Sequence, residues 1–503
     1  MVQFADRLLI DRSHQTPLYL QLVQGFEALI EEGALEPGER LPASRDLSRM
    51  LGVNRQTVTS AYEALGSRGL VSSHVGQGTF VSKSLERQPA LRWSLSRASS
   101  GGRQRVRTPI DDPRHPDAID FASLVPDEEL FPVEPYRSVL DQALAKEGKK
   151  LLQYGPAAGH PPLRSFIADR LRKRGMTIEP ENVLIVNGSQ QALDLICRTL
   201  VDPGDRVVVE SPTYTIILPL LAQYQARIDE VPMTATGIDL DALSGVLSRA
   251  RPKFIFTMPT FHNPTGTTLD LPSRRRLLAI AAEHDVPVVE DDFDSELRFD
   301  GKDLPPLAAL DDRRAVLHIG TFSKGLFPGV RLGWIVAPPA IASALERSKL
   351  ISDYYTSLLP QAAVLSFCEQ GHYDEHLRRL AVIYRSKSRR LTEALTSHAP
   401  EGVRWTQPEG GFAFWVSLPA GVSADAMLAD SARAGVLFTP GSHFFAREDG
   451  RRFLRLSISR VPEARIEEGV RKLCEIIAQS LSHHRSTGAT ESETGDQEPA
   501  LHI

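Results

Sequence analysis

Alternation between short apolar runs and helical patterns over residues 119–480 constrains the fold more than any other feature of the sequence. The runs read VLIV, RVVVE, KFIFTMP and VPVVEDD, and helical patterns lie between them. Strands that alternate with helices of about 10–15 residues form βαβ units and a largely parallel sheet. We therefore expect a large α/β domain over residues 119–480.

Two stretches without this alternation flank the expected domain. Residues 84–118 are rich in Ser, Gly, Pro and Arg and show no sustained period, which indicates a flexible linker. Residues 481–503 contain few apolar side chains, which predicts a disordered tail. Residues 1–83 form a compact block ahead of the linker. A chain of 503 residues has room for about two to four domains, which accommodates this division.

Composition argues against several classes of protein. The three cysteines, Cys197, Cys368 and Cys474, are widely spaced and form no CxxC pair, so we expect neither a disulfide scaffold nor a metal site. The N-terminal residues lack the pattern of a signal peptide, and no run approaches the roughly 18 apolar residues of a membrane span. The net charge of −5 neither demands nor forbids nucleic acid. These features favour a cytoplasmic protein without a membrane partner.

The N-terminal block has the pattern of three helices and a hairpin. A first helix is predicted from apolar residues on one face at Leu18, Leu22, Phe26, Leu29 and Ile30. A short helix capped by Ser44 follows, Gly52 ends it, and Asn54 caps a further helix that ends near Gly69. Two helices joined by a tight turn form a helix-turn-helix. The segment LVSSHVGQGTFV then alternates like a hairpin, with Gly76 and Gly78 at its bend, and would form a wing.

Polar residues at the start of the last helix indicate what this block binds, because the second helix of a helix-turn-helix lies in the DNA major groove. These residues are Arg55, Gln56, Thr57, Thr59 and Ser60. Arg and Gln can reach base edges, while hydroxyls and the preceding Arg45 can hold phosphates. A protein-interaction module is the alternative, since residues 1–83 hold 8 Lys and Arg against 9 Asp and Glu. The ordered series of helix, turn, capped helix and wing favours DNA.

The segment LPASRDLSRMLGVNRQTVTSAYEALGSRGLVSSHVGQGTFV resembles the winged helix-turn-helix of the GntR family over almost the whole family signature. The resemblance implies that Arg45, Arg55 and the wing around Gly76 and Gly78 contact a double-stranded DNA operator. Gln77 departs from the family pattern, in which a small residue such as serine is expected, and this departure bears on the wing contact.

The motif GTFSKGLFPGVRLGW, residues 320–334, carries the first sign of covalent chemistry in the large domain. Lys324 lies in a turn of small residues, where a positioned and deprotonated amine can form an imine with an aldehyde. Thr321, Ser323 and Arg331 could gather two hydroxyls and a guanidinium around one phosphate. The alternative for this motif alone is an exposed surface lysine in a loop.

Three further motifs follow predicted strands. In VNGSQQALDL the backbone N–H groups of Ser189 and Gln190 open a helix, where anions bind, although such turns are common. In VPVVEDDFDSE a buried aspartate at the strand end could hold a protonated pyridine nitrogen, whereas Asp292 and Asp294 are better interpreted as a solvated acidic loop. In TMPTFHNPTGTTL the amide of Asn263 could donate to a ring oxygen beside a proline–glycine turn.

Together these motifs resemble the fold-type I aminotransferase family of pyridoxal 5'-phosphate (PLP) proteins over about residues 119–480. The resemblance implies that Lys324 holds PLP as an internal aldimine. It implies that Asp291 pairs with the pyridinium nitrogen and Asn263 with the 3'-oxygen. The phosphate contacts it implies are Ser189, Gln190, Thr321, Ser323 and Arg331.

Three more residues match the family pattern. Tyr214, in ESPTYT, matches the aromatic residue that stacks on the cofactor ring, and Arg455, in RRFLRLSIS, matches the arginine that binds a substrate carboxylate. Tyr154, in QYGPAAGHPPLR, matches the tyrosine that reaches a neighbouring subunit's phosphate, which implies a homodimer. A helix-start tyrosine and a lone strand arginine are the alternatives for Tyr214 and Arg455.

Two departures from the aminotransferase pattern carry information. Phe293 stands where the family has a tyrosine whose hydroxyl bonds the 3'-oxygen, and its loss should leave that oxygen less stabilised as an anion and favour the protonated imine. Binding could survive this change better than fast turnover. Leu124 and Val125, in FASLVPDEELFP, stand where the pattern has a glycine.

A GntR-like winged helix, a linker and an aminotransferase-like domain, in that order, resemble the MocR/GabR class of bacterial transcription regulators. The resemblance implies a homodimer, commonly head-to-tail, in which PLP and an amino compound act as the sensor, and Arg455 suggests a carboxylate on that effector. Two other functions stay open. One is an active aminotransferase with a vestigial N-terminal block, and the other is a PLP-salvage or protein-interaction module.

Overall fold

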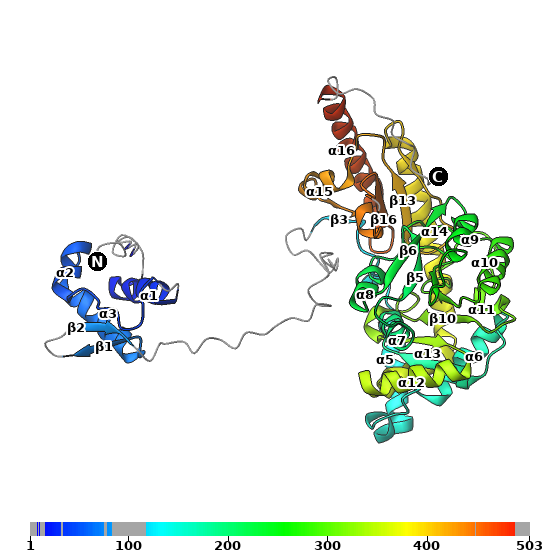
Figure 1. Cartoon of the computed structure of the whole chain (residues 1–503), viewed down its shortest axis with the longest axis horizontal. Coiled ribbons are helices and arrows are strands. Elements are labelled where there is room, and N and C mark those ends of the chain that lie inside the picture. Colours follow the sequence, from blue (N-terminus) through cyan, green and yellow to red (C-terminus); the bar gives the residue numbers. More distant parts are fainter. Residues whose placement is uncertain are drawn as a thin grey trace. The chain divides into compact units, whose positions relative to one another are not determined.

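The computed structural model of the chain describes residues 8, 10, 16–31, 34–74, 78–82, 117–447 and 449–487, the side chains of 31 and 485–487 excepted. It divides into two compact units, Met1–Leu95 and Ser96–Ile503 (Figure 1). Most of the predicted linker, the wing-tip residues Gly76 and Gln77, and the end of the predicted tail lie outside the described residues. Within the described part of the chain, no helix is long and apolar enough to cross a membrane.

The N-terminal unit is the predicted winged helix-turn-helix. Its elements are α1 (Leu18–Glu31), α2 (Ser44–Leu51), α3 (Arg55–Ser67), β1 (Val71–His74) and β2 (Gly78–Val81). The two strands pair antiparallel, and His74 lies opposite Gly78 at the start of the wing. The helices enclose a small apolar core, which includes Leu22, Phe26, Leu47, Val58, Leu65 and Val81. This core fixes the face of α3 that points outward.

The caps of α2 and α3 hold the turn between them. Asn54 Oδ1 accepts a hydrogen bond from the Gln56 backbone N–H at 2.9 Å, as predicted for an N-cap, and Gly52 ends α2 in the left-handed region at φ 62°. The prediction for Ser44 was wrong by one residue. Ala43 occupies the N-cap and no side chain caps α2, because Ser44 already lies within the helix.

The large unit is built on an eight-stranded sheet in the order β4-β11-β10-β9-β8-β5-β6-β7. The apolar runs of the sequence all form strands in it, and β5, β6, β8, β9 and β10 pair in parallel. The mainly parallel α/β fold is therefore confirmed. The strands are β4 (Val183–Val186), β5 (Arg206–Ser211), β6 (Arg227–Thr234), β7 (Gly237–Ile238), β8 (Ile255–Thr257), β9 (Val288–Asp291), β10 (Val316–Thr321) and β11 (Gly333–Val336).

Helices pack around this sheet and bury both of its faces (Figure 1). They are α5 (Val133–Glu147), α6 (Pro161–Lys173), α7 (Ser189–Leu200), α8 (Ile217–Gln223), α9 (Leu240–Leu247), α10 (Leu271–Glu283), α11 (Leu307–Leu310), α12 (Pro339–Ser352) and α13 (Leu358–Glu369). Among the described residues of the large unit there are also short 3-10 helices: η3 (Glu128–Leu130), η4 (Gly148–Leu152), η5 (Pro180–Asn182), η6 (Pro328–Val330), η7 (Gly441–Phe444) and η8 (Glu463–Arg465).

A smaller subdomain of the same unit contains a four-stranded antiparallel sheet in the order β12-β13-β16-β15. Its strands are β12 (Arg404–Trp405), β13 (Ala413–Ser417), β15 (Thr439–Pro440) and β16 (Phe453–Ser457), and its helices are α14 (His372–His398), α15 (Ala424–Arg433) and α16 (Ile466–Thr487). The first strand of the unit, β3 (Ile119–Asp120), pairs in parallel with β14 (Val436–Leu437). The chain therefore passes from the predicted linker directly into this subdomain.

The predicted start of the disordered tail needs correction. Helix α16 continues to Thr487, so the boundary expected at residue 480 falls inside a helix. Ile476 and Ile477 are buried before the expected boundary, and Leu481 continues the apolar face beyond it by packing against the main core. The composition of this segment did not reveal the helix, because the residues between its apolar positions are polar and lie on the exposed face of α16.

Candidate functional site

The site forms where consecutive strands of the large sheet end. Lys324 follows β10, Asp291 is the last residue of β9, and Asn263 lies in the loop after β8. Helix α7 begins at Ser189, shortly after β4. Ligands of α/β proteins bind at the carboxyl ends of the strands, so the fold brings together motifs that are far apart in sequence.

Lys324 is half-buried, and a hydrogen bond fixes the position of its amine. Its Nζ donates a hydrogen bond to the Leu124 carbonyl at 2.8 Å. Burial, with help from the positive charge of Arg455, lowers its pKa to about 8, although Asp294 and Asp291 oppose the shift. The alternative of an exposed surface lysine is therefore excluded. The amine is neutral for a larger fraction of the time than an ordinary lysine at the same pH.

This lowered pKa predicts the pH dependence of the amine's reactivity. A lysine with a pKa of about 8 is mostly neutral above pH 8, whereas the ordinary value of 10.5 leaves a lysine mostly charged there. We expect the rate at which Lys324 forms a borohydride-reducible adduct with an aldehyde to rise up to about pH 8 and then level off. Mass spectrometry of the trapped peptides measures this rate, with the exposed Lys302 as an internal control. A Lys324 rate that keeps rising in parallel with Lys302 would contradict the prediction.

Asp291 and Asn263 supply the groups expected beside a pyridine ring. Asp291 is 3% exposed, and burial together with the neighbouring Asp292 raises its pKa to about 7. Its Oδ1 has no hydrogen-bond partner among the described residues, so it is available to a donor. Asn263 is also buried, and its Oδ1 accepts from Arg455 Nη1 at 3.2 Å. That bond orients the amide so that its N–H groups remain available as donors.

The turn before α7 has the features of an anion site. Gly188 has φ 86°, and a Cβ placed on it would lie 2.9 Å from Arg331 Nη2, so the guanidinium packs directly against the glycine backbone. Gln190 Oε1 in the first turn of α7 is buried without a partner in the described structure. Backbone N–H groups at Ser189 and Gln190 and the nearby guanidinium suit a phosphate.

Two hydroxyls expected at the same phosphate also lie close to each other. Thr321 Oγ1 is 3.0 Å from Ser323 Oγ, and the Ser323 backbone N–H donates to Thr321 Oγ1 at 3.1 Å. Both side chains are buried at the end of β10, immediately before Lys324. The structure thus orders these residues around the turn that carries the lysine.

Arg455 lies on β16 of the small sheet and enters the site from there. It is 5% exposed, with Nη2 bonded to the Ala122 carbonyl and to Thr439 Oγ1. Its guanidinium also lies over the Phe444 ring, 5.3 Å from the centroid, and burial lowers its pKa to about 10. Arg455 lies on a strand, as the alternative has it, but its guanidinium is buried and has several partners, so it is not a lone arginine. Tyr214 is half-buried near Asp291 and Arg455, and burial raises its pKa.

Tyr154 is not brought to the lysine of its own chain. Its side chain is 74% exposed and packs edge-on against Tyr354 and Tyr355, at centroid distances of 5.4 and 5.3 Å. A residue that serves the site of a second copy would have this exposure.

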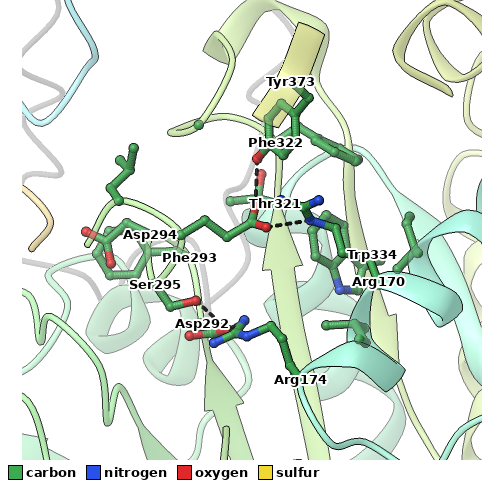
Figure 2. Close-up of a pocket in the computed structure, with 15 residues that line it drawn as sticks. Arg170, Arg174, Asp292, Phe293, Asp294, Ser295, Thr321, Phe322, Trp334 and Tyr373 are labelled. Atoms are coloured by element: carbon green, nitrogen blue, oxygen red, sulfur yellow. Dashed lines mark hydrogen bonds and ion pairs between the residues drawn. The ribbon is translucent and has the colours of Figure 1, made fainter. Parts of the chain in front are cut away.

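The prediction of a solvated acidic loop at Asp292 and Asp294 was wrong, because both carboxylates are buried. Figure 2 shows Arg174 and Ser295 converging on Asp292, each 2.8 Å from Oδ2. Burial is the largest single influence on Asp292 and opposes its ionisation, but Arg174, His318 and the Ser295 hydroxyl together lower its pKa. For Asp294, burial raises the pKa well above its ordinary value. The cation that allows Asp292 to be buried comes from the end of α6, which the local sequence does not reveal.

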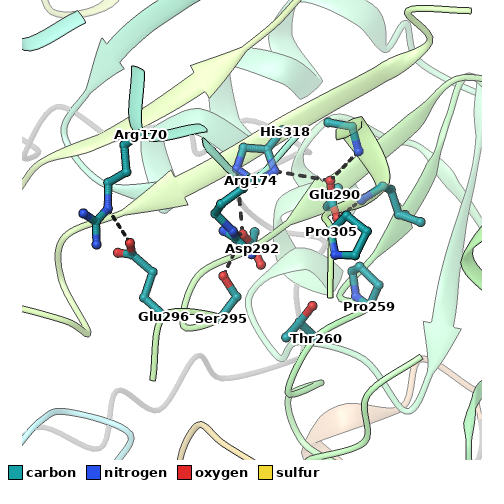
Figure 3. Close-up of polar contacts among 12 residues, drawn as sticks. Arg170, Arg174, Pro259, Thr260, Glu290, Asp292, Ser295, Glu296, Pro305 and His318 are labelled. Carbon is teal, nitrogen blue, oxygen red and sulfur yellow. Dashed lines mark hydrogen bonds and ion pairs between the residues drawn. The ribbon is translucent and has the colours of Figure 1, made fainter. Parts of the chain in front are cut away.

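The buried acidic cluster continues behind β9. His318 lies between Glu290 and Asp292, with Nδ1 3.2 Å from Glu290 Oε2 and Nε2 3.9 Å from Asp292 Oδ2 (Figure 3). Glu290 also accepts from the Leu307 and Ala308 backbone N–H groups at the start of α11. Sequence analysis missed this cluster, which fixes the strand that carries Asp291.

The segment that departs from the family pattern at Leu124 contacts the site through its backbone. The Leu124 carbonyl receives the Lys324 amine, and Ala122, two residues earlier, receives Arg455. The Asp120 carboxylate holds the segment by accepting from the backbone N–H groups of Ala122 and Ser123, at 2.8 and 3.0 Å. One segment immediately after the predicted linker therefore contacts both functional cations.

In the N-terminal unit, Arg45, Arg55 and Gln56 are exposed. Arg55 Nε lies 3.4 Å from Ser44 Oγ, which links the starts of α2 and α3. Thr57 and Thr59 are half-buried, and Thr59 Oγ1 donates to the Arg55 carbonyl at 3.1 Å. Helix α3 thus presents Arg55 and Gln56 most openly, whereas the Thr59 hydroxyl is engaged within the helix.

Gly78 begins β2 at φ 114°, and a Cβ there would lie 3.0 Å from Arg40 Nε. Arg40, which sequence analysis did not consider, is exposed and forms a bridge with Phe80 in the wing strand. Backbone hydrogen bonds from Gly38 to Val81 and from Leu41 to Thr79 place this cation beside the wing strand, and no local sequence signal indicates that pairing.

Comparison with known proteins agrees with this geometry. Residues 119–473 match the family described as aminotransferase class I and II, and residues 18–81 match the bacterial regulatory proteins of the gntR family. The chain belongs to the class I and II aminotransferase family. It carries a GntR-family domain at its N-terminus. Family members depend on PLP, and the unpartnered Asp291 Oδ1 and the turn at Gly188 fit that cofactor here.

Two curated relatives differ in how much of the chain they match. Aromatic-amino-acid aminotransferase 1 of Thermococcus litoralis is 37% identical over 73% of this chain and 89% of its own length. The probable rhizopine catabolism regulatory protein MocR of Rhizobium meliloti is 32% identical over 93% of this chain and 95% of its own length. The regulator therefore matches the N-terminal unit as well as the large one.

A solved structure supports the cofactor assignment. The α-aminoadipate aminotransferase of Thermus thermophilus, complexed with N-(5'-phosphopyridoxyl)-L-leucine, is 36% identical and superimposes with a TM-score of 0.71. The match covers 77% of this chain and all of that chain (100%). That compound is a cofactor–amino acid adduct, so a neighbour with this fold accommodates both parts of the ligand expected here.

Proposed function

We propose that this chain is a DNA-binding transcription regulator that senses an amino compound through PLP attached at Lys324. The match to MocR over 93% of the chain is the observation that carries the proposal, because aminotransferases such as that of T. litoralis match only 73%. An exposed Arg55 and Gln56 on α3 and a lysine site in the large unit support both halves of the function.

Different residues of the site would bind different parts of the cofactor. When bound, PLP supplies an electrophilic carbon that joins amines reversibly. The Lys324 amine, with its pKa of about 8, would hold the cofactor covalently, and Asp291 would hold its ring nitrogen. The Ser189 and Gln190 N–H groups, the Thr321 and Ser323 hydroxyls and Arg331 would bind the phosphate. Asn263 would orient the 3'-oxygen, and Tyr214 would cover the ring face.

The contacts of one segment support an amino acid as the effector. Lys324 and Arg455 bond the carbonyls of Leu124 and Ala122, whose Cα atoms can lie no more than about 7 Å apart. A compound with an amine and a carboxylate a few bonds apart can therefore reach both cations. Arg455 would hold the compound's carboxylate in place of the Ala122 carbonyl, and the compound's amine would lie close to the Lys324 amine. The affinity for DNA then changes if the domain with the effector bound and the domain without it favour different arrangements of the DNA-binding units.

The proposed functional unit is a homodimer, head-to-tail as in the MocR/GabR class. Tyr154 packs against Tyr354, and Leu152 and Ile351, which precede them closely along the chain, are 68% and 86% exposed. Patches rich in aromatic and aliphatic side chains mark protein interfaces. A second copy would bury these side chains and bring Tyr154 to the partner's phosphate site.

The visible spectrum of the PLP-loaded full chain during titration with α-amino acids, ω-amino acids and polyamines tests the proposal. A regulator is expected to give a spectral shift with one compound, no accumulation of pyridoxamine 5'-phosphate, and a change in DNA affinity with the same compound. Steady conversion to pyridoxamine 5'-phosphate that a keto acid reverses would instead identify an aminotransferase, the alternative that the T. litoralis relative supports.

The missing tyrosine hydroxyl at Phe293 leads to a separate prediction. Phe293 lines a small cavity together with Asp294 and Thr321 (Figure 2). A hydroxyl at this position would stabilise the anionic 3'-oxygen and so disfavour protonation of the cofactor's imine nitrogen. We expect Phe293→Tyr to lower the pH of the visible absorbance transition by about one unit, the shift that corresponds to one hydrogen bond to a charged group. Phe293→Leu, which adds no hydroxyl, is the control, and an equal shift in both variants would contradict the explanation.

A further inference from the structure

Asp353, immediately after α12, is bonded on both carboxylate oxygens. Its Oδ2 accepts from Asn187 Nδ2 and from Gln191 Nε2, both at 2.7 Å. Its Oδ1 accepts from the Nζ of Lys349, a lysine with no exposed surface, at 2.8 Å. Burial lowers the pKa of Lys349, while Asp353 opposes this and stabilises its charged form. The carboxylate therefore joins the end of α12 to the turn that precedes α7.

Asn187 is held at three points of this turn. Its backbone N–H donates to Gln191 Oε1 at 2.8 Å, its side-chain amide donates to Asp353, and its carbonyl accepts from Arg331 Nη2 at 2.6 Å. Gly188 follows in the left-handed region, and α7 begins at the next residue. The direction of the first N–H groups of α7 and the place of the Arg331 guanidinium both depend on how Asn187 is held.

We propose that Asp353 is a positioning residue that holds the turn at residues 187–191 in the conformation that binds the cofactor phosphate. The inference rests on the proposed assignment of the phosphate to Ser189, Gln190 and Arg331. Asp353 acts at one remove, through Asn187 and Gln191. Without its carboxylate, two side-chain amides and a buried ammonium group lose their acceptor, and the turn loses the bonds that select one arrangement.

Comparison of PLP with pyridoxal, which lacks the phosphate, tests this role in the full chain. We expect Asp353→Asn to raise the Kd of the cofactor-free protein for PLP by at least about tenfold, the effect of losing one or two hydrogen bonds to a charged group. Borohydride trapping of pyridoxal at Lys324 should stay within about twofold of the unchanged chain, because pyridoxal does not use the turn. Inorganic phosphate should also compete less well with PLP in the variant.

Asp239→Asn is the matched control. Asp239 likewise accepts two hydrogen bonds, from the N–H groups of Asp241 and Ala242 at the start of α9, but it does not contact the turn. It should leave both PLP and pyridoxal unchanged. Gln191→Leu removes one donor to Asp353 and the acceptor of the Asn187 N–H, and it keeps the Asp353–Lys349 pair. It gives a second test of the hydrogen bonds that hold the turn, with several-fold weaker PLP binding expected, if Asp353→Asn does not fold.

Two results would overturn the proposal. Equal losses of PLP and pyridoxal reactivity in Asp353→Asn would assign the residue to general stability, and an unchanged Kd for PLP in both variants would remove it from the phosphate site. Measurements on the unchanged chain distinguish failure of the role proposed for Asp353 from failure of the proposed function. If it bound PLP no more tightly than pyridoxal, the phosphate assignment itself would be wrong, and if no adduct formed at Lys324, the attachment site would be wrong.

Discussion

Lys324→Ala is expected to abolish covalent attachment of PLP completely. The Lys324 amine has a lowered pKa of about 8 and a fixed place beside Asp291 and Arg455, whereas alanine has no nucleophile to offer. Treatment with borohydride followed by mass spectrometry should find no reduced adduct in the variant. The visible absorbance of the attached cofactor should be lost with it, since a free aldehyde absorbs differently from an imine.

A surface lysine provides the control for this variant. Lys253 pairs with Asp205 at 3.2 Å, well away from the motif that carries Lys324, so Lys253→Ala should retain the adduct. The alanine variant should still bind PLP without a covalent bond, because Asp291 and the phosphate turn remain. An adduct that persists in Lys324→Ala would assign the chemistry to another amine and refute the central residue of the site.

Arg55→Ala is expected to weaken binding to a specific DNA site by about 10- to 100-fold, since a bidentate arginine–guanine pair contributes about 1–3 kcal/mol. Arg55 is the first residue of α3, and it is exposed on the helix end that enters the major groove in helix-turn-helix proteins. The site can be found by selecting random duplexes with the full chain. Competition binding at one fixed salt concentration then compares the variants, because phosphate contacts depend strongly on salt.

Arg68→Ala is the matched control at the opposite end of α3. Arg68 pairs with Glu27 of α1 and is the C-cap of the helix, so its loss removes the same charge without touching the recognition end. We expect its DNA affinity to stay close to that of the unchanged chain. Equal effects of the two substitutions would indicate a nonspecific charge effect, and no effect of Arg55→Ala would refute the placement of the recognition helix.

Local patterns in the sequence were sufficient to predict the fold of both units. The apolar runs became β4, β5, β8 and β9, because a strand buried on both faces has to be apolar throughout. The N-cap at Asn54 and the left-handed Gly52 were also local signals, since each depends on the conformation of a few neighbouring residues. The end of α16 was misplaced because amphipathic helices can have polar composition.

Motifs in the sequence also named the main residues of the large site, since Lys324, Asp291 and Asn263 each stand in a recognisable local context. The sequence by itself therefore determined the class of fold, the likeness to both families and the candidate lysine. The DNA-binding face was predicted in the same way, from the polar start of α3. Each of these conclusions depends on residues that are neighbours along the chain.

Only the tertiary structure decided which charges are buried and what holds them. Asp292 meets Arg174 across 118 residues, Asn187 meets Asp353 across 166, and Lys324 meets Leu124 across 200. A carboxylate next to a strand looks solvated until the distant cation that neutralises it is known, because the free energy of burying a charge depends on its partner. Electrostatics and hydrogen bonding in this site are properties of contacts between distant segments, and the folded arrangement of those segments determines them.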